Sequence, residues 1–263
     1  MSGTVRVGEA DDDRFDRARR IGWLDIGAVF RAKILMIGAG ALGNEVAKDL
    51  ALSGFGKITV VDMDRVVASN LSRCLFFDAK DADDRRPKSE AICEGVRRLS
   101  PQADPVGIVS KIEDCGDSLF ADNDVILGCL DNVNARVHAN AHSYHVGRPY
   151  IDGGMEGFIG KVMVSLPPDG ACLQCGMNRS HAKIAEMRFS CTGRDVVFHE
   201  PPTPAEITTT SVISAVIVRE ALKIVSGRKD MLLRNAVYYD GQRNVCEEFE
   251  VDLNPECPVH GPR

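Results

Sequence analysis

The spacing Gly38-x-Gly40-x-x-Gly43 constrains the fold of this chain more than any other feature. It follows an apolar run at residues 33–37 and opens a helix-forming run at residues 42–53. Glycines at this spacing allow a tight turn from a strand into a helix and a close approach of the backbone to a ligand. The helix N-terminus presents N–H groups to an anion. We therefore expect a strand–turn–helix unit that binds a nucleotide.

The alternation of strands and helices continues beyond this turn. We expect strands at residues 57–62, 106–110 and 124–130, and helices at residues 88–99, 132–145 and 207–225. Such alternation is typical of a parallel sheet covered by helices. After Asp152 the pattern changes to strands without intervening helices, at residues 161–166, 236–239 and 245–251. The segment 64–87 is predicted to be a polar loop, and no linker is long enough to separate two independent domains.

Composition excludes several classes of protein. The net charge of the 263 residues is −6, and the few aromatic residues do not alternate with Lys or Arg, so we expect no nucleic-acid partner. The longest apolar run, Val212–Val225, contains three charged residues and is too short to cross a bilayer. The N-terminus does not have the pattern of a signal peptide, and nine cysteines in a chain of this size favour metal or catalytic thiols. We expect a cytoplasmic protein without a membrane partner.

Charged residues distinguish between candidate nucleotides. Asp62 ends the strand after the glycine turn, where a carboxylate binds ribose hydroxyls, but this fits a dinucleotide and ATP equally well. Arg73 and Lys88 favour ATP, because they can neutralise a triphosphate, although each alone is more often a solvated charge. Asp131 ends an apolar strand and suits Mg²⁺, although Asp131 and Asn132 are also a common N-cap pair. A nicotinamide dehydrogenase is the weaker alternative.

Two short turns carry metal-ligand residues. Cys172-x-x-Cys175 and Cys257-x-x-His260 together supply the sulfur and imidazole ligands of a tetrahedral Zn²⁺ site. Four protein ligands leave no open position for catalysis, so the ion would be structural and would tie the end of the chain to its middle. Two unrelated thiol turns are the alternative.

Between residues 33 and 251 the chain resembles the superfamily of ThiF and MoeB proteins and ubiquitin-activating enzymes. The matching motifs lie at residues 38–43, 61–64, 69–73, 86–88, 130–136, 152–160 and 172–175. The resemblance implies a Rossmann-like, eight-stranded sheet, mainly parallel and continuing into antiparallel strands, in a single adenylation domain with structural zinc. It implies an N-terminal helical arm at 1–30, the adenylation domain at 31–263, a crossover segment at about 176–206 and a zinc-binding turn at 255–261.

The resemblance also implies which residues act. Contacts to ATP and Mg²⁺ are expected from Gly38, Gly40, Gly43, Asp62, Asp64, Asn70, Arg73, Lys88, Asp131 and Asn132. Catalytic roles would fall on Asp131, which would hold Mg²⁺, on Arg73, on Cys191 and on Arg17. Arg17 would reach into the ATP site of a partner subunit, while a charged helix face is the simpler account of that residue. The chain departs from the family pattern at Cys74, where Gln is usual, and at His260, where Cys is usual.

Cys191 lies in the polar segment 189–194, before prolines at 201, 202 and 204. This resembles the crossover segment in which activators of ubiquitin-like proteins carry a thioester-forming cysteine, and a thiolate attacks an acyl-adenylate readily. The implied function is ATP-dependent adenylation of the C-terminal carboxylate of a ubiquitin-like or sulfur-carrier protein ending in Gly-Gly, followed by thioester formation on Cys191. The implied assembly is a homodimer, with a conjugating enzyme as a further candidate partner. The alternatives are an activator that stops at the adenylate, an activator of a small molecule or a tRNA base, and a non-catalytic partner subunit.

Overall fold

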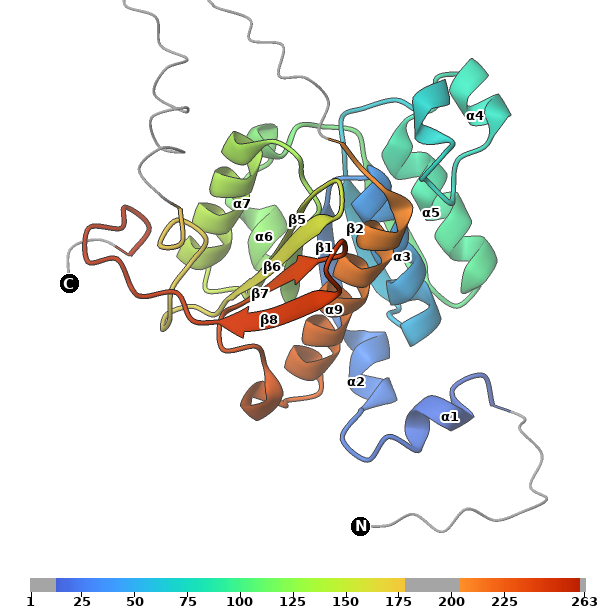
Figure 1. Cartoon of the computed structure of the whole chain (residues 1–263). Helices are drawn as coiled ribbons and strands as arrows, with labels where there is room; N and C mark the ends of the chain where they lie inside the picture. Colours follow the sequence, from blue (N-terminus) through green and yellow to red (C-terminus); the bar gives the residue numbers. More distant parts are fainter. Residues whose placement is uncertain (1–12, 178–203, 261–263) are drawn as a thin grey trace, which may run out of the picture.

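The computed structural model describes residues 13–177 and 204–260 (Figure 1). Eight strands form one sheet in the order β3-β2-β1-β4-β5-β6-β7-β8. Strands β1 to β5 pair in parallel, and β5 to β8 pair in antiparallel fashion, which confirms the predicted fold class. The strands are β1 (Lys33–Ile37), β2 (Lys57–Val61), β3 (Asp104–Ile108), β4 (Val125–Gly128), β5 (Tyr150–Glu156), β6 (Ile159–Ser165), β7 (Ala236–Asp240) and β8 (Val245–Phe249).

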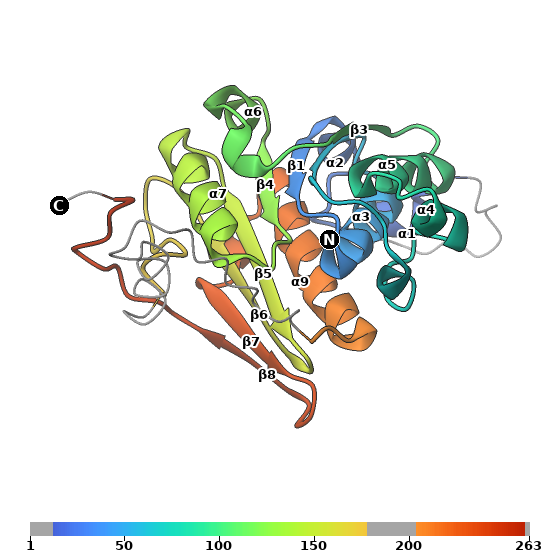
Figure 2. The ribbon, with the colours of Figure 1, turned by 90° about the horizontal axis from the view of Figure 1, so that it is seen from above.

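Helices cover both faces of the sheet (Figure 2). Helices α3 (Ala41–Ser53), α5 (Lys88–Leu99) and α9 (Ile207–Val225) pack on one face, and α6 (Asp117–Ala121) and α7 (Val133–His145) on the other. The remaining helices are short: α1 (Asp16–Arg19), α2 (Ile26–Arg31), α4 (Ala79–Asp83), and the 3₁₀ turns η1 (Ala68–Asn70), η2 (Ile112–Asp114) and η3 (Lys229–Met231). Within the described residues, no helix is both long enough and apolar enough to cross a membrane.

The two-sided burial explains why the central strands are continuously apolar. In β1, Ile34 and Met36 belong to the core under α3 and α9, whereas Leu35 and Ile37 belong to the core under α7. Successive side chains of a strand point to opposite faces, so both sets must be hydrophobic. The parallel strands β1, β2 and β4 end in register, with Ile37 opposite Val61 and Gly128. Their carboxyl ends therefore open at one edge of the sheet.

The segment 64–87, predicted as a polar loop, also contains the short helices η1 and α4. Helix α4 buries none of its residues and begins with a reciprocal capping pair, Asp78 and Asp81. Local hydrogen bonds of this kind stabilise a helical turn without an apolar stripe, so hydrophobic periodicity does not reveal it. Helix α6, in the connection between β3 and β4, was also not predicted, because its five residues bury only Phe120 and are too few to show a period.

The N-terminal helices pack at the end of the sheet opposite the carboxyl ends of the parallel strands. The backbone N–H of Asp25 donates to Ser226 Oγ at 3.2 Å, just beyond α9. Phe15 lies against Gly54, which ends α3, and Arg14 donates to the carbonyl of Leu99 at 2.7 Å. The division into an arm at 1–30 and a domain at 31–263 stays a prediction. Most of the predicted crossover segment, with Cys191, lies outside the described residues.

Candidate nucleotide site and metal centre

A cavity opens at the carboxyl ends of the parallel strands, above the N-terminus of α3. Most of the predicted cofactor residues line it: Gly38, Gly40, Asp62, Asp64, Asn70, Arg73, Lys88 and Asp131. They come from five separate parts of the chain, so the fold brings together groups that are up to 93 residues apart, which is the separation of Gly38 and Asp131. Gly43 does not line the cavity, and its role is in the turn itself.

A different physical reason explains the presence of glycine at each of the three positions of the turn. Gly38 has φ of +100°, and a Cβ there would lie 2.4 Å from the carbonyl oxygen of Cys129. A Cβ at Gly43 would lie 2.1 Å from the carbonyl oxygen of Gly38. A Cβ at Gly40 would meet no protein atom within 4 Å and would project into open space. Packing therefore requires Gly38 and Gly43, whereas the bare Cα of Gly40 lines the cavity and leaves room for a ligand.

Asn44 supports the turn and was not predicted from the sequence. It is fully buried, donates from Nδ2 to the carbonyl of Gly40 at 2.9 Å and accepts from the backbone N–H of Phe76 at 2.9 Å. This one amide joins the glycine turn to the loop that follows η1. In the sequence, only its position directly after Gly43 could have indicated that Asn44 supports the turn.

Asp62 sits beside the turn and is fixed by the backbone. Its two oxygens accept from Ala39 N at 2.6 Å and from Asp64 N at 2.7 Å. Burial raises the pKa of Asp62 above its usual range, and the two backbone donors oppose that shift. Each oxygen keeps a second lone pair, so the carboxylate can also accept a hydroxyl group of a bound sugar.

Two cations and one amide face the cavity from the loop and from α5. Lys88 begins α5, is 9 % exposed and pairs with the exposed Asp64 at 2.8 Å. Arg73 donates to the carbonyl of Ser69 at 2.6 Å, which holds the guanidinium over η1. Asn70 is buried and accepts from Val67 N at 3.0 Å. Both cations are thus held by neighbours that leave part of their donor capacity for a ligand.

Asp131 and Asn132 follow β4 and have separate tasks. Asn132 Oδ1 accepts from the backbone N–H groups of Asn134 and Ala135, so its side chain is the N-cap of α7. Asp131 is exposed, and no group among the described residues is hydrogen-bonded to its carboxylate. The capping alternative therefore applies to Asn132, and the carboxylate of Asp131 stays available at the mouth of the cavity.

A second cavity adjoins the first and was not predicted. The two share Gly38, Asp62, Asp64, Leu130 and Asp131. The rest of the lining of the second cavity is mixed: Val61, Met63, Ile112 and Ala135 are apolar, whereas Ser110, Lys111, Glu113 and Asn134 are polar. Val61, Ile112 and Ala135 lie on β2, η2 and α7, and in the sequence they look like ordinary core positions. A ligand that placed a sugar and phosphates in the first cavity could place an attached flat group in the second.

A buried ion pair supports the cavity from behind. Arg136 on α7 donates from Nε to Asp152 Oδ1 on β5 at 3.1 Å and pairs with the same carboxylate through Nη2. Tyr150 donates to Asp152 Oδ1 at 2.8 Å. A Cβ at Gly154 would lie 2.8 Å from the Arg136 guanidinium, which explains a glycine at this lining position. The pair joins α7 to β5 next to the cavity.

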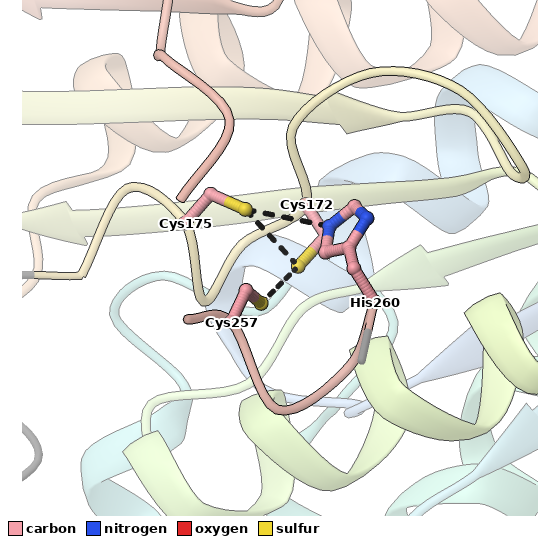
Figure 3. A group of neighbouring side chains, drawn as sticks. All are labelled: Cys172, Cys175, Cys257 and His260. Atoms are coloured by element: carbon pink, nitrogen blue, oxygen red, sulfur yellow. Dashed lines mark hydrogen bonds between the residues drawn. The ribbon is translucent and has the colours of Figure 1, made fainter. Parts of the chain in front are cut away.

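The four predicted zinc ligands meet in space (Figure 3). The ligand atoms of Cys172, Cys175, Cys257 and His260 all lie within 4.8 Å of one another. Cys172 Sγ lies 3.9 Å from Cys175 Sγ and 3.6 Å from Cys257 Sγ, and Cys175 Sγ lies 3.3 Å from His260 Nε2. Tetrahedral Zn–S bonds of about 2.3 Å place two sulfurs roughly 3.8 Å apart. The donor set and its spacing therefore fit a structural Zn²⁺ ion, and the three cysteines are free thiols.

One predicted residue lies far from this site in its own chain. Arg17 is on α1, whereas the cavity lies at the N-terminus of α3. Helix α3 has 13 residues and separates the two ends of the sheet, a length of about 20 Å. Arg17 is therefore not a neighbour of the cavity of its own subunit.

Comparison with known proteins gives one family. Residues 16–259 match the model of the ThiF family. The chain is 33% identical over 163 residues to the NEDD8-activating enzyme E1 catalytic subunit of Schizosaccharomyces pombe, a match that covers 60% of this chain and 36% of that protein. It is 26% identical over 250 residues to the sulfur carrier protein adenylyltransferase of Thermus thermophilus, covering 88% of this chain and 83% of that protein.

A solved structure has the same fold. The crystal structure of Escherichia coli MccB with ATP aligns with a TM-score of 0.74 and 19% sequence identity, over 96% of this chain and 76% of that chain. The chain spans 36% and 65% of the length of two NEDD8-activating relatives, from Schizosaccharomyces pombe and Arabidopsis thaliana. The family model matches residues 16–259, which contain the sheet and the cavity described above. Because this match covers most of the sequence, the chain belongs to the ThiF family.

Proposed function

We propose that the protein binds MgATP at the carboxyl ends of β1, β2 and β4 and adenylates a carboxylate. The observation that carries this proposal is the convergence of Arg73, Lys88, Asp131 and the glycine turn on one cavity. Two cations and a helix N-terminus suit a chain of phosphates, and Asp62 suits a ribose. The apolar side chains of the second cavity, Val61, Ile112 and Ala135, suit the face of an adenine ring.

The reaction needs charge stabilisation at the α-phosphate. An incoming carboxylate oxygen forms a bond to the α-phosphorus, and the bond to the bridging oxygen breaks, so that pyrophosphate leaves. Arg73 and Lys88 would stabilise the charge on the phosphates, and the N–H groups at the start of α3 would do the same. Asp131 would hold Mg²⁺, which supplies Lewis-acid stabilisation of the phosphate oxygens when bound. This chain's residues thus orient ATP and neutralise it.

The carboxylate is proposed to be the C-terminus of a ubiquitin-like or sulfur-carrier protein that ends in Gly-Gly. The names of the relatives support this class of substrate, because they include a sulfur carrier protein adenylyltransferase and a SAMP-activating enzyme E1 of Haloferax volcanii. A homodimer is the proposed assembly. A cytoplasmic location is proposed because the eight described cysteines are all free thiols.

The test is ATP–pyrophosphate exchange in the presence of a candidate carrier protein. The wild-type protein is expected to exchange label only with the carrier present, and truncation of the carrier's last two glycines should abolish exchange. Asp131→Asn should reduce the exchange rate about 100-fold or more, because a metal ligand at the phosphates contributes several kcal/mol. Asp122→Asn, at an exposed position away from the cavity, is the matched control. Exchange without any carrier would instead favour an activator of a small molecule or a tRNA base.

Thioester formation on Cys191 is a separate proposal, because an adenylate alone is a sufficient product for a sulfur-carrier activator. Incubation with ATP and carrier, followed by a non-reducing gel, distinguishes the two outcomes. A thiol-sensitive band that Cys191→Ala removes would support the thioester and a downstream conjugating enzyme. Carrier-dependent exchange by the wild-type protein without any thiol-sensitive band would assign it to the activators that stop at the adenylate.

A further inference from the structure

Helix α7 carries a polar residue at every fourth position along one side: Asn132, Arg136, Asn140 and Tyr144. Residues four apart on a helix lie above one another on the same face. The first two of these residues act at the cavity, as the N-cap of α7 and as the partner of Asp152. The last two lie at the other end of the helix, beside the Cys₃His cluster. The same face of one helix thus contacts both centres.

Tyr144 fixes the tautomer of His260. The Tyr144 hydroxyl donates its single proton to the carbonyl of Pro168, which can only accept. The same hydroxyl oxygen lies 2.9 Å from His260 Nδ1, so it must accept the Nδ1–H proton. The lone pair of the neutral ring is then on Nε2, the atom that lies 3.3 Å from Cys175 Sγ. Tyr144 therefore presents the imidazole in the form that a metal ion binds.

Asn140 plays the matching part at Cys172. It is fully buried, and its Oδ1 accepts from the backbone N–H of Leu173 at 3.1 Å. The Asn140 side chain also neighbours Cys172, yet its Nδ2 is buried and makes no hydrogen bond. A thiol sulfur is a weak acceptor, whereas a metal-bound thiolate would satisfy this buried donor.

We propose that Asn140 and Tyr144 are positioning residues for the metal ion, and that the bound ion in turn holds α7 in place between the Cys₃His cluster and the nucleotide cavity. From one face of the helix, Tyr144 contacts the ligand His260, and Asn140 binds the backbone of Leu173, directly after the ligand Cys172. The ion therefore closes a connection from the C-terminal turn at 257–260 to the helix whose N-cap flanks Asp131. The proposal concerns metal retention and helix dynamics, so it can be tested without ATP or a carrier protein.

The first test is the rate of zinc release. Full-length protein loaded with zinc is mixed with excess chelator and a colorimetric zinc indicator. Tyr144→Phe keeps the aromatic ring but removes the hydroxyl, and it should release zinc about tenfold faster or more, as loss of such outer partners does at other metal sites. Tyr238→Phe on β7 is the matched control and should release zinc at the wild-type rate. Equal rates for the two variants would overturn the proposal.

Asn140→Asp tests the other contact. It keeps an oxygen that can accept from Leu173 N but replaces the donor with a second oxygen that repels the Cys172 thiolate. Faster zinc release than in the wild type is expected, and an unchanged rate would remove Asn140 from the proposal. Because a buried substitution can also impair folding, the surface-accessible Tyr144→Phe variant decides the question if Asn140→Asp does not fold.

A second pair of variants separates a role at the metal from a role in the loop at Pro168. His260→Cys provides a sulfur ligand that has no Nδ1–H for Tyr144 to accept. In the His260→Cys background, Tyr144→Phe should therefore leave zinc release unchanged. An equal acceleration in both backgrounds would mean that Tyr144 acts through Pro168 and would overturn its role toward His260.

Hydrogen exchange tests the connection to α7. Removing zinc from the wild-type protein should increase amide exchange over residues 133–145, and Tyr144→Phe should show part of that increase with zinc bound. Exchange over α5, at residues 88–99, provides an internal reference on the opposite face of the sheet. Unchanged exchange in α7 after zinc removal would refute the claim that the ion holds the helix.

Discussion

At the scale of single residues, Gly40 provides the sharpest distinction between folding and binding. Its φ of −76° suits any amino acid, and a Cβ there meets no protein atom. Gly40→Ala should therefore fold with a wild-type melting temperature. The added methyl group would occupy space that a phosphate needs, so ATP affinity should fall about tenfold or more, a loss of at least 1.4 kcal/mol. Calorimetric titration with MgATP measures this change.

The comparison variant is Gly43→Ala, in which the new Cβ would collide with the carbonyl of Gly38. It should lower the melting temperature itself, because the collision is with the protein backbone. If Gly40→Ala bound ATP as tightly as the wild type, the glycine turn would not be the phosphate site.

The Arg136–Asp152 pair gives a prediction about stability. The Asp152 side chain is 2% exposed and that of Arg136 is 22% exposed, so solvent screens the pair only weakly. Asp152→Asn would leave the guanidinium charge buried without a counter-ion and should lower the free energy of unfolding by about 3 kcal/mol. Urea unfolding of Asp152→Asn, with Asp122→Asn as the exposed control, measures the difference. A loss below about 1 kcal/mol would mean that the pair behaves as a surface ion pair.

At this scale, the sequence predicted residues that belong to local motifs. Asp62 and Asp131 come after strands, Lys88 begins a helix and Arg73 lies in the motif at 69–73, and all four line the cavity. Asn44 and the Arg136–Asp152 pair escaped prediction, because their partners lie on other elements and polar core residues have no periodic pattern. The role of Cys191 stays a prediction.

At the scale of secondary-structure elements, long helices with an apolar face were predicted well. The predicted bounds 207–225 coincide with those of α9, which buries nine residues along its length. The short helices α4 and α6 escaped prediction because they bury at most one residue each. Strand β3 begins at Asp104, two residues before the predicted start, because Pro105 at this sheet edge made the first residues look like a loop.

Helix α7 also predicts a pH dependence. The rings of His138 and His142 lie 4.0 Å apart, and the neighbouring groups are Asp117 and Phe120 of α6 and Glu113 of η2. Burial, and then the proximity of His142, lower the pKa of His138. The unfolded chain therefore binds a proton at this residue at a higher pH than the folded chain. The free energy of unfolding should fall as pH drops below about 6.5 toward the lowered pKa.

Urea unfolding at pH 7.5 and 5.5 measures this effect. His138→Gln should show a weaker loss of stability between the two pH values than the wild type. His145→Gln, at the exposed end of the same helix, is the control. An identical loss in His138→Gln and in the wild type would show that other groups account for the acid sensitivity.

At the scale of the whole molecule, a parallel sheet that continues into antiparallel strands followed from general rules and from the family resemblance, whereas the order of the strands and the spatial relation between the two centres did not. The cysteine spacing predicted a metal site, and the glycine spacing predicted a nucleotide site. Only the structure shows that one helix, α7, contacts both: its N-cap Asn132 lines the second cavity, and Tyr144 contacts His260. A connection of this kind depends on which side of a helix faces which loop, and that is decided by tertiary packing.

The proposed homodimer gives a prediction about Arg17. Because α1 lies at the far end of α3 from the cavity, Arg17 can serve catalysis only in the cavity of a partner subunit. Arg17→Ala and Asp131→Asn should each be inactive alone in carrier-dependent exchange. Co-refolded in equal amounts, they should recover about a quarter of the wild-type rate, since about half of the dimers would be mixed and each would contain one intact site.

No recovery in the mixture, with mixed dimers verified by mass spectrometry, would contradict a role of Arg17 across the subunit interface. Full activity of Arg17→Ala alone would leave the charged helix face as the account of this residue.

The central claim is that the cavity at the carboxyl ends of the parallel strands is a MgATP site. Its most direct test is isothermal titration of the zinc-loaded protein with ATP in the presence of Mg²⁺. We predict saturable binding of one ATP per chain that Arg73→Ala and Lys88→Ala each weaken, together with no measurable binding of NAD. Binding of NAD in preference to ATP, or the absence of ATP binding, would contradict the account.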